Sequence, residues 1–221
     1  FRPKQTLHAY EQIWTKAGSP LIISTLKIKE KLIKKTGWHV EIAMRYEDPS
    51  IELALNNLKS NGFNKVYVVP LYPHNAMATT ITTKVEVERL AREIYPEAEL
   101  RFIKPFYKNE KYIKAISKGV RKCLSQHNFD KLIFSYHGIP KRQAKKTDIT
   151  GAHCFENNDC CEVESLGSND CYKAHTVQSS ILIAKELGLK SSEWEIAYQS
   201  RIGPGWLTPF TDTVSYTHLR A

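Results

Sequence analysis

The chain contains no long apolar run, no internal repeat and no low-complexity tract. None of its windows approaches the roughly 18 uncharged apolar residues that a membrane-spanning helix needs, so we expect no such span. A signal peptide is also missing, but the first residue is Phe1 rather than Met, and we therefore expect an absent N-terminal segment that leaves targeting open. With 221 residues, 42% of them hydrophobic, the chain has room for one large or two small domains with a sizeable core.

A motif typical of nucleic-acid binding is also absent, because the aromatic and basic side chains are not interleaved. The net charge is nevertheless +9, with basic residues scattered over 27–35, 108–122 and 141–146. A basic surface that improves solubility explains this charge as well as attraction to an anionic lipid or a carboxylate-bearing substrate does. We therefore expect no nucleic-acid partner, and both explanations of the charge stay open.

Helical and strand-like segments alternate along the chain. Apolar spacing, capping residues and glycines predict helices over 5–14, 22–35, 51–61, 79–94, 109–125 and 178–187. Runs of β-branched and aromatic residues predict strands over 38–44, 66–69, 100–103, 131–136 and 194–199. Strands separated by helices form parallel sheets covered on both faces, so the predicted class is α/β, with ligands bound beyond the carboxyl ends of the strands. A hinge at 104–106 is the best candidate for a domain boundary.

Polar and aromatic residues follow the predicted strands where a plain turn would carry Gly, Asn or Asp. His137 is the foremost of them, because Gly138 and Pro140 make its turn rigid and a neutral imidazole there can bind a metal or accept a proton. A purely structural histidine is the alternative. The other candidates, which suit an anionic group beside an apolar wall, are Arg45, Tyr46, Ser200, Arg201 and Trp206. Their alternatives are a surface ion pair at the first strand end and a turn with a core tryptophan at the second.

Four of the five cysteines lie in one polar segment, as Cys154, Cys160, Cys161 and Cys171. A packed core does not need four thiols in a hydrophilic stretch, so redox or metal chemistry is indicated. The spacing lacks the C-x2-C pairs typical of zinc sites, and the adjacent Cys160 and Cys161 cannot form an ordinary disulfide with each other. Four thiolates suit a [2Fe–2S] cluster, with zinc and free or disulfide-bonded thiols as alternatives. Cys123 is expected to be a core thiol, and His153 and His175 are weaker ligand candidates.

Several short segments, in order over residues 1–212, carry the pattern of a known family. They are Ala9-Tyr10 to Ile13-Trp14, Gly18-Ser19-Pro20-Leu21, Ala43-Met44-Arg45-Tyr46, Pro70-Leu71-Tyr72-Pro73, Thr79-Thr80, Ser135-Tyr136-His137-Gly138-Ile139-Pro140, and Gln199-Ser200-Arg201 with Trp206-Leu207. With these segments the chain resembles the ferrochelatases, the enzymes that insert Fe(II) into a porphyrin at the end of haem synthesis.

The resemblance implies two similar Rossmann-like domains with parallel sheets, at 1–105 and 106–221, and a porphyrin cleft between them. It implies insertion of Fe(II) into protoporphyrin IX to form protohaem, with His137 binding the incoming metal or taking the pyrrole protons. It also implies a cytoplasmic enzyme with porphyrin and ferrous iron as partners, either free or in peripheral contact with the inner membrane. The implied substrate-binding residues are Arg2, Tyr10, Ser19, Arg45, Tyr46, Ser200, Arg201 and Trp206.

The chain departs from the family's pattern in three places. The family's first strand is missing, and so is the later helix whose glutamate accompanies the histidine. After Asp212 the sequence no longer resembles the family, so residues 213–221 are expected to be a foreign or misread tail. The third departure is an insertion at about 143–177 that contains the four clustered cysteines and resembles the internal [2Fe–2S] segment of some microbial ferrochelatases. We therefore expect a fragment that lacks parts of both domains and is inactive alone.

Other functions of the same fold remain open. A non-catalytic porphyrin or haem carrier, or an iron–sulfur sensor, would use the same residues without turnover. A cobalt or nickel chelatase acting on another tetrapyrrole is the enzyme alternative, although those relatives usually lack one of the segments 136–140 and 199–201. The sequence distinguishes neither protoporphyrin from coproporphyrin nor one oligomeric state from another.

Overall fold

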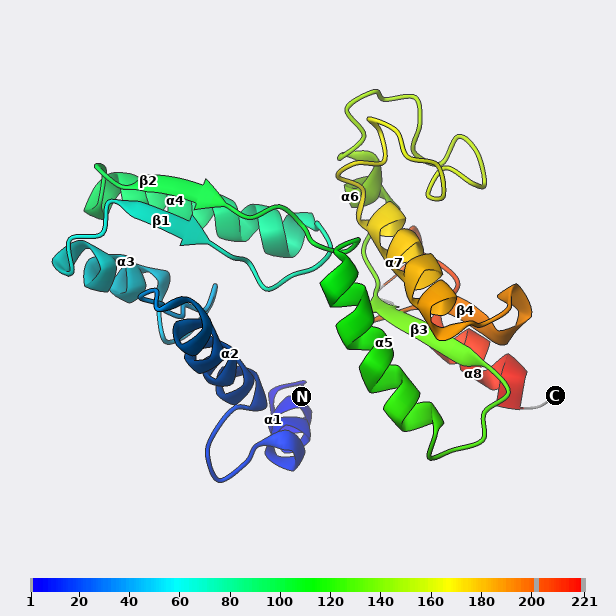
Figure 1. Cartoon of the computed structure of the whole chain (residues 1–221). Helices are drawn as coiled ribbons and strands as arrows, with labels where there is room; N and C mark the ends of the chain where they lie inside the picture. The colour runs from blue at the N-terminus through cyan, green and yellow to red at the C-terminus, as the bar shows by residue number, and fades with distance from the viewer. Residues whose placement is uncertain (1, 201–202, 220–221) are drawn as a thin grey trace. The chain divides into compact units, whose positions relative to one another are not determined.

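The computed structural model describes residues 2–200 and 203–219, and the chain divides into two compact units (Figure 1). Unit 1 comprises Phe1–Tyr67 and Val85–Arg101, and unit 2 comprises Val68–Lys84 and Phe102–Ala221. The chain therefore leaves unit 1 after β1 and returns to it for α4 and β2.

Unit 1 is built mainly from helices around one short strand pair. The helices are α1 (Arg2–Ile13), α2 (Pro20–Thr36), α3 (Ile51–Ser60) and α4 (Thr82–Ile94). Pro20 opens α2 with a favourable φ, and Gly37 ends it in the left-handed conformation, donating its amide to the Ile33 carbonyl at 2.8 Å. The Ser50 side chain caps α3 by accepting the Leu53 amide at 3.1 Å. These signals explain why the helices begin and end close to where the sequence predicts.

The strand pair of unit 1 joins β1 (Lys65–Val68) to β2 (Glu99–Phe102). The Glu99 amide donates to Asn64 and the Ile103 amide to Val68, so the sequence number rises in the same direction on both strands and the pair is parallel. The strand predicted over 38–44 is wrong, because within it only Met44 forms a bridge, to Ser50. This segment is held by side chains instead, with Trp38 stacked on Tyr67 at 5.5 Å between ring centroids.

Unit 2 contains the second parallel pair, β3 (Leu132–His137) with β4 (Trp194–Gln199), in a register that sets His137 opposite Gln199. The crossover between them carries α6 (Lys141–Lys145), the cysteine-rich segment, α7 (Tyr172–Leu187) and η2 (Ser191–Glu193). Figure 1 shows α7 lying along α5 (Glu110–Leu124), and α7 also packs on β4. The unit is completed by the π-helical turn η1 (Met77–Ile81) and by α8 (Thr211–Leu219), which packs on β4.

Helix α7 supplies much of the core of unit 2, although many of its buried residues are polar. Thr176, Ser179 and Ser180 are fully buried, and each donates its hydroxyl hydrogen to a backbone carbonyl. Tyr136 and Tyr198 from the two strands then bond Ser180 and Thr176, at 2.9 and 3.0 Å. Burying these hydroxyls costs little because each has a partner. The α/β class with parallel sheets, predicted from the sequence, is confirmed, and in the described residues each sheet is a pair of strands.

Candidate functional site

His137 is the last residue of β3, and its side chain is exposed. The turn that follows it is paired on two sides. On one side the Gly138 amide donates to the Gln199 carbonyl at 2.8 Å, and on the other the Leu207 amide donates to the Ile139 carbonyl at 3.0 Å. A Cβ atom at position 138 would lie 2.6 Å from the Gln199 oxygen, so only glycine allows this approach. The rigid turn therefore presents the imidazole at a fixed point beyond the carboxyl end of the strand.

The candidates that follow β4 lie beside this turn. Ser200 comes directly after Gln199, the partner of His137, and is exposed with a left-handed φ of 65° that favours glycine. Trp206 is half-buried, and its backbone forms a bridge with Pro140. The structure thus brings Ser200 and Trp206 to the same edge as His137, while Arg201 lies outside the described residues.

The remaining substrate-binding candidates belong to unit 1. The Arg45 guanidinium lies 4.7 Å from the ring centre of the exposed Tyr46, and its buried Nε has no hydrogen-bond partner among the described residues. Tyr10 is exposed on α1 and meets Trp14 edge to face at 6.2 Å. Ser19 occupies the N-cap of α2, where its side chain accepts no helix amide within the described part of the chain. Arg2 lies at the start of α1, and its side chain is not described.

The four cysteines of the polar segment are all buried and belong to one apolar cluster with Ala144, Tyr172, Tyr198 and Leu207. The sulfur atoms of Cys160 and Cys161 are 3.8 Å apart. By contrast, Cys123 is exposed on α5, so its prediction as a core thiol is wrong. Within the described ranges, no group of three or more His, Cys, Asp or Glu side chains is arranged to hold a single metal ion.

The thiols of the segment influence one another's protonation. The pKa of Cys171 is lowered to about 6, first by the hydrogen bond that the Cys161 thiol donates and also by backbone amides at the start of α7. The pKa of Cys161 rises far above its ordinary value through that same bond and through burial. Burial, and then the negative charge of Cys171, raise the pKa of Cys154 to about 12. Of these three thiols, Cys171 therefore forms a thiolate, the form that binds metals, most readily.

Asp148 organises the start of the cysteine-rich segment. Its carboxylate accepts the Thr150 hydroxyl at 2.6 Å and the backbone amides of His153 and Cys154 at 2.9 and 2.8 Å. These bonds, the Thr150 hydroxyl first, hold the pKa of Asp148 well below its usual range. A Cβ atom at position 167 would lie 2.6 Å from the same carboxylate, so Gly167 lets the end of the segment pack on its beginning.

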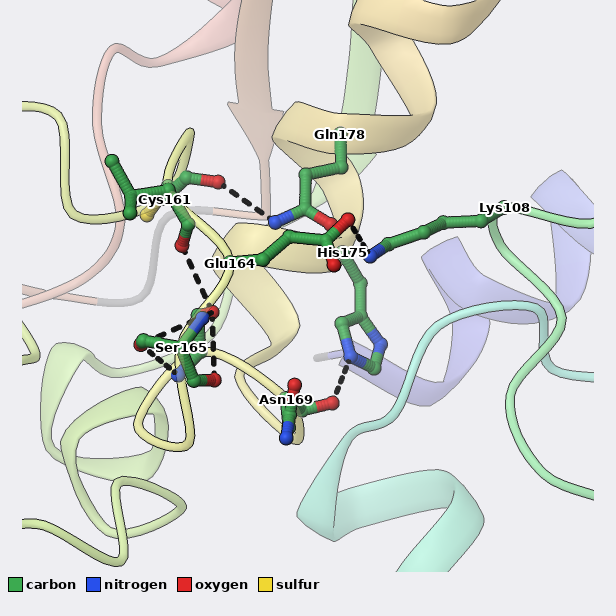
Figure 2. A network of polar contacts seen from close by, with 9 residues as sticks. Lys108, Cys161, Glu164, Ser165, Asn169, His175 and Gln178 are labelled. Atoms are coloured by element: carbon green, nitrogen blue, oxygen red, sulfur yellow. Dashed lines mark hydrogen bonds and ion pairs between the residues drawn. The ribbon is translucent and has the colours of Figure 1, made fainter.

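A second network anchors the other end of the segment, and Figure 2 shows part of it around His175. The Asn75 amide donates to His175 Nδ1 at 3.0 Å, so Nε2 carries the hydrogen and donates to the Asn169 carbonyl at 2.7 Å. The ring also stacks on Tyr107 at 3.7 Å. Both nitrogens are engaged, so His175 does not offer a lone pair to a metal. His153 likewise uses its Nε2, which donates to the Cys160 carbonyl at 2.7 Å.

A family model described as Ferrochelatase matches residues 1–218, so the match continues past Asp212, where the sequence was expected to leave the family's pattern. The chain belongs to the ferrochelatase family. The ferrochelatase of Pseudomonas fluorescens (strain Pf0-1) is 38% identical over 216 residues, which are 96% of this chain and 62% of the relative. That of Stutzerimonas stutzeri is 39% identical over 217 residues, and that of Azotobacter vinelandii 38% over 218, each covering 96% of this chain and 63% of the relative. The chain thus spans less than two thirds of the length of these ferrochelatases.

Two residues that shape the site of this ferrochelatase-family chain were not identified from the sequence. Tyr172 donates its hydroxyl to the His137 carbonyl at 2.9 Å across 35 positions, a contact that no local pattern signals. Asp148 could have been identified, because an aspartate side chain often forms a turn by bonding the residue two positions later, here Thr150.

Among the described helices none is long and apolar enough to cross a membrane.

Proposed function

We propose that this chain carries the active-site region of a ferrochelatase that inserts Fe(II) into protoporphyrin IX and forms protohaem. The observation that supports this most is His137, exposed on a rigid turn at the end of β3, in a chain whose residues 1–218 match the family. The proposal includes two Rossmann-like domains, at 1–105 and 106–221, with a porphyrin cleft between them. Each contributes one of the parallel strand pairs, β1–β2 and β3–β4.

The reaction needs a base and no redox change. Fe(II) enters the macrocycle, two pyrrole nitrogens each lose a proton, and the product is neutral at the ring. An imidazole that is exposed and fixed by the 138–140 turn is suited to take such protons or to hand over the metal. We assign this role to His137.

The porphyrin is a flat apolar disc with two propionates, so it needs aromatic walls and a few cations. We assign its contacts to Arg2, Tyr10, Ser19, Arg45, Tyr46, Ser200, Arg201 and Trp206. Arg45 is the best supported of them, because its buried Nε is without a partner in the described residues and a carboxylate would satisfy it. Tyr46, against which the guanidinium lies, keeps that cation in place.

We further propose that Cys154, Cys160, Cys161 and Cys171 bind one [2Fe–2S] cluster. The donor set fits such a group, because four buried thiols lie in one apolar cluster and such a group takes four thiolate ligands. When bound, the cluster would supply a one-electron centre and tie the four positions together. The chain's own contribution is to hold the thiols: Asp148 fixes the amide of Cys154, and the Gln178 side chain donates to the Cys161 carbonyl at 3.2 Å.

We place the protein in the cytoplasm, with porphyrin and ferrous iron as its partners. Contact with the inner membrane would be peripheral and would use the apolar side chains that α1 and the next residue leave exposed. These are Leu7, Ile13 and Trp14.

The experiment is a chimera in which this chain replaces the matched part of the Pseudomonas fluorescens ferrochelatase. Under anaerobic conditions we expect the chimera to form protohaem from protoporphyrin IX and Fe(II). The haem absorption of the product measures this activity. The matched control is the unmodified relative, assayed in parallel. Tight porphyrin binding without any protohaem would support the non-catalytic carrier instead.

A further inference from the structure

The peptide group between His137 and Gly138 is held at both ends. Its carbonyl accepts the Tyr172 hydroxyl at 2.9 Å, and its N–H donates to the Gln199 carbonyl at 2.8 Å. Because a peptide group is planar, two bonds on opposite sides fix its rotation and with it the backbone ψ angle of His137. An accepted bond at the oxygen also polarises the group and strengthens the bond from its N–H. Tyr172 therefore helps to set the direction in which the imidazole leaves the backbone.

Tyr172 is itself held firmly. It is 9% exposed, and its ring meets that of His74 edge to face at 6.1 Å. It is the first residue of α7, so Cys171, the N-cap, precedes it directly. A shift of the Cys171 backbone must therefore move the Tyr172 hydroxyl.

The start of α7 is anchored on either side of these two residues. Before them, Asn169 accepts from the His175 ring at 2.7 Å and Asp170 accepts from the Asn75 side chain at 2.9 Å. After them, His175 accepts the Asn75 backbone amide at 3.0 Å (Figure 2 shows the ring and Asn169). With the ends fixed, a change at Cys171 is not absorbed by the flanking chain and reaches Tyr172.

We propose that Tyr172 is a positioning residue that orients His137 and links it to Cys171. A shift of Cys171 within the cysteine cluster would then change the orientation of His137 through the single hydroxyl group of Tyr172. The inference rests on the proposed function for the roles of His137 and the cysteines. The hydrogen bond itself does not depend on that function, and the test keeps the two apart.

The first measurement is hydrogen exchange of the Gly138 amide in the 221-residue chain, followed by NMR. Tyr172→Phe removes only the hydroxyl, and we expect exchange at Gly138 to accelerate by about twofold to tenfold, the loss of one net hydrogen bond. The matched control is Tyr136→Phe, which removes a 2.9 Å hydroxyl bond between β3 and the same helix. It should leave Gly138 unchanged. Equal acceleration in both variants, or none in Tyr172→Phe, would overturn the proposal.

The second measurement tests the link to the cysteines. Cys171→Ser should accelerate exchange at Gly138 in the otherwise unchanged chain and add nothing when combined with Tyr172→Phe. Amides within 132–135 should keep their rates in every variant, which separates this local effect from general loss of stability. Additive effects of the two substitutions would show that Cys171 acts by another route and would contradict the link. If Cys171→Ser prevents folding, Cys171→Ala takes its place in the same comparison.

The third measurement uses the chimera. Tyr172→Phe should lower kcat about twofold to tenfold and leave the KM for porphyrin unchanged, because it disturbs the histidine rather than the substrate contacts. An unchanged kcat would overturn the positioning role. A chimera that forms no protohaem with Tyr172 in place would instead refute the proposed function, and the exchange results would still decide whether Tyr172 holds His137.

Discussion

The carboxylate of Asp148 accepts the backbone amide of Cys154 at 2.8 Å, and the same carboxylate also binds Thr150 and His153. One charged side chain thus shapes the turn that carries the first of the four clustered cysteines. An asparagine in its place keeps the shape but offers a single acceptor oxygen for these donors. We expect Asp148→Asn to make the segment 147–171 clearly more sensitive to limited proteolysis. Asp159→Asn, at an exposed position of the same segment, is the control and should not change the digestion pattern.

Stability should fall in mild acid because two histidines, the buried His175 and the half-buried His74, stay neutral in the folded chain. Burial lowers the pKa of His74 from 6.5 to about 4, and burial likewise lowers that of His175 to about 4. Between these values the unfolded chain binds protons that the folded chain does not, so the stabilisation present above pH 6.5 is lost as the pH falls toward 4. Each histidine contributes up to about 1 kcal/mol per pH unit.

The check is the urea unfolding midpoint at pH 7 and at pH 5. His74→Gln should reduce the difference between the two midpoints by about half. His127→Gln, at an exposed position, should leave it unaltered. Equal pH dependence in the chain and in His74→Gln would mean that His74 does not contribute.

The cysteine cluster should take up iron and sulfide as a unit. After reconstitution with ferrous iron and sulfide, we expect about two irons per chain and visible sulfide-to-iron charge-transfer bands. Changing any one of the four clustered cysteines to serine should remove the bands, whereas Cys123→Ser, at an exposed position of α5, should keep them. Full iron and sulfide content in both Cys160→Ser and Cys161→Ser would contradict the cluster, and one zinc per chain would support the zinc alternative.

Arg45 should contribute strongly to porphyrin binding. A charge-assisted hydrogen bond to a propionate contributes about 1.5–3 kcal/mol, so Arg45→Ala should weaken binding by about tenfold to a hundredfold. Fluorescence quenching on titration with protoporphyrin measures this in the chimera. Arg101→Ala is the control, since that exposed arginine pairs with Glu99 and Tyr67. Unchanged affinity in Arg45→Ala would return Arg45 to a role in surface charge.

The sequence was sufficient wherever the determining contacts are local. The apolar run before His137 and the glycine after it predicted a histidine at the end of a strand and on a rigid turn, and the structure has both. The prediction that Cys123 is a core thiol was wrong because only one face of α5 is buried. That face includes Ile113 and Ser117, and Cys123 lies about 240° further round the helix than Ser117. The prediction of a strand over 38–44 was wrong because a strand needs a neighbouring strand to pair with, and the local residue pattern does not show whether one is present.

Contacts between distant segments could not be predicted from the sequence for the same reason. Asn75 meets His175 across 100 positions, and Tyr172 meets His137 across 35. Both depend on where α7 begins, and it begins at Tyr172, six residues before the predicted start at Gln178. The convergence of the cysteines could be inferred from their number in one segment, but the hydrogen bonds that order them depend on the tertiary structure.

The central claim is that His137 carries metal insertion, and the most direct test is the rate of protohaem formation by the chimera with His137→Ala. His127→Ala, which removes another exposed histidine of the same unit, is the comparison. We expect His137→Ala to lose at least about a hundredfold in kcat, the typical contribution of a general base, while porphyrin still binds and His127→Ala keeps full activity. Near-normal turnover by a folded, porphyrin-binding His137→Ala protein would contradict the claim.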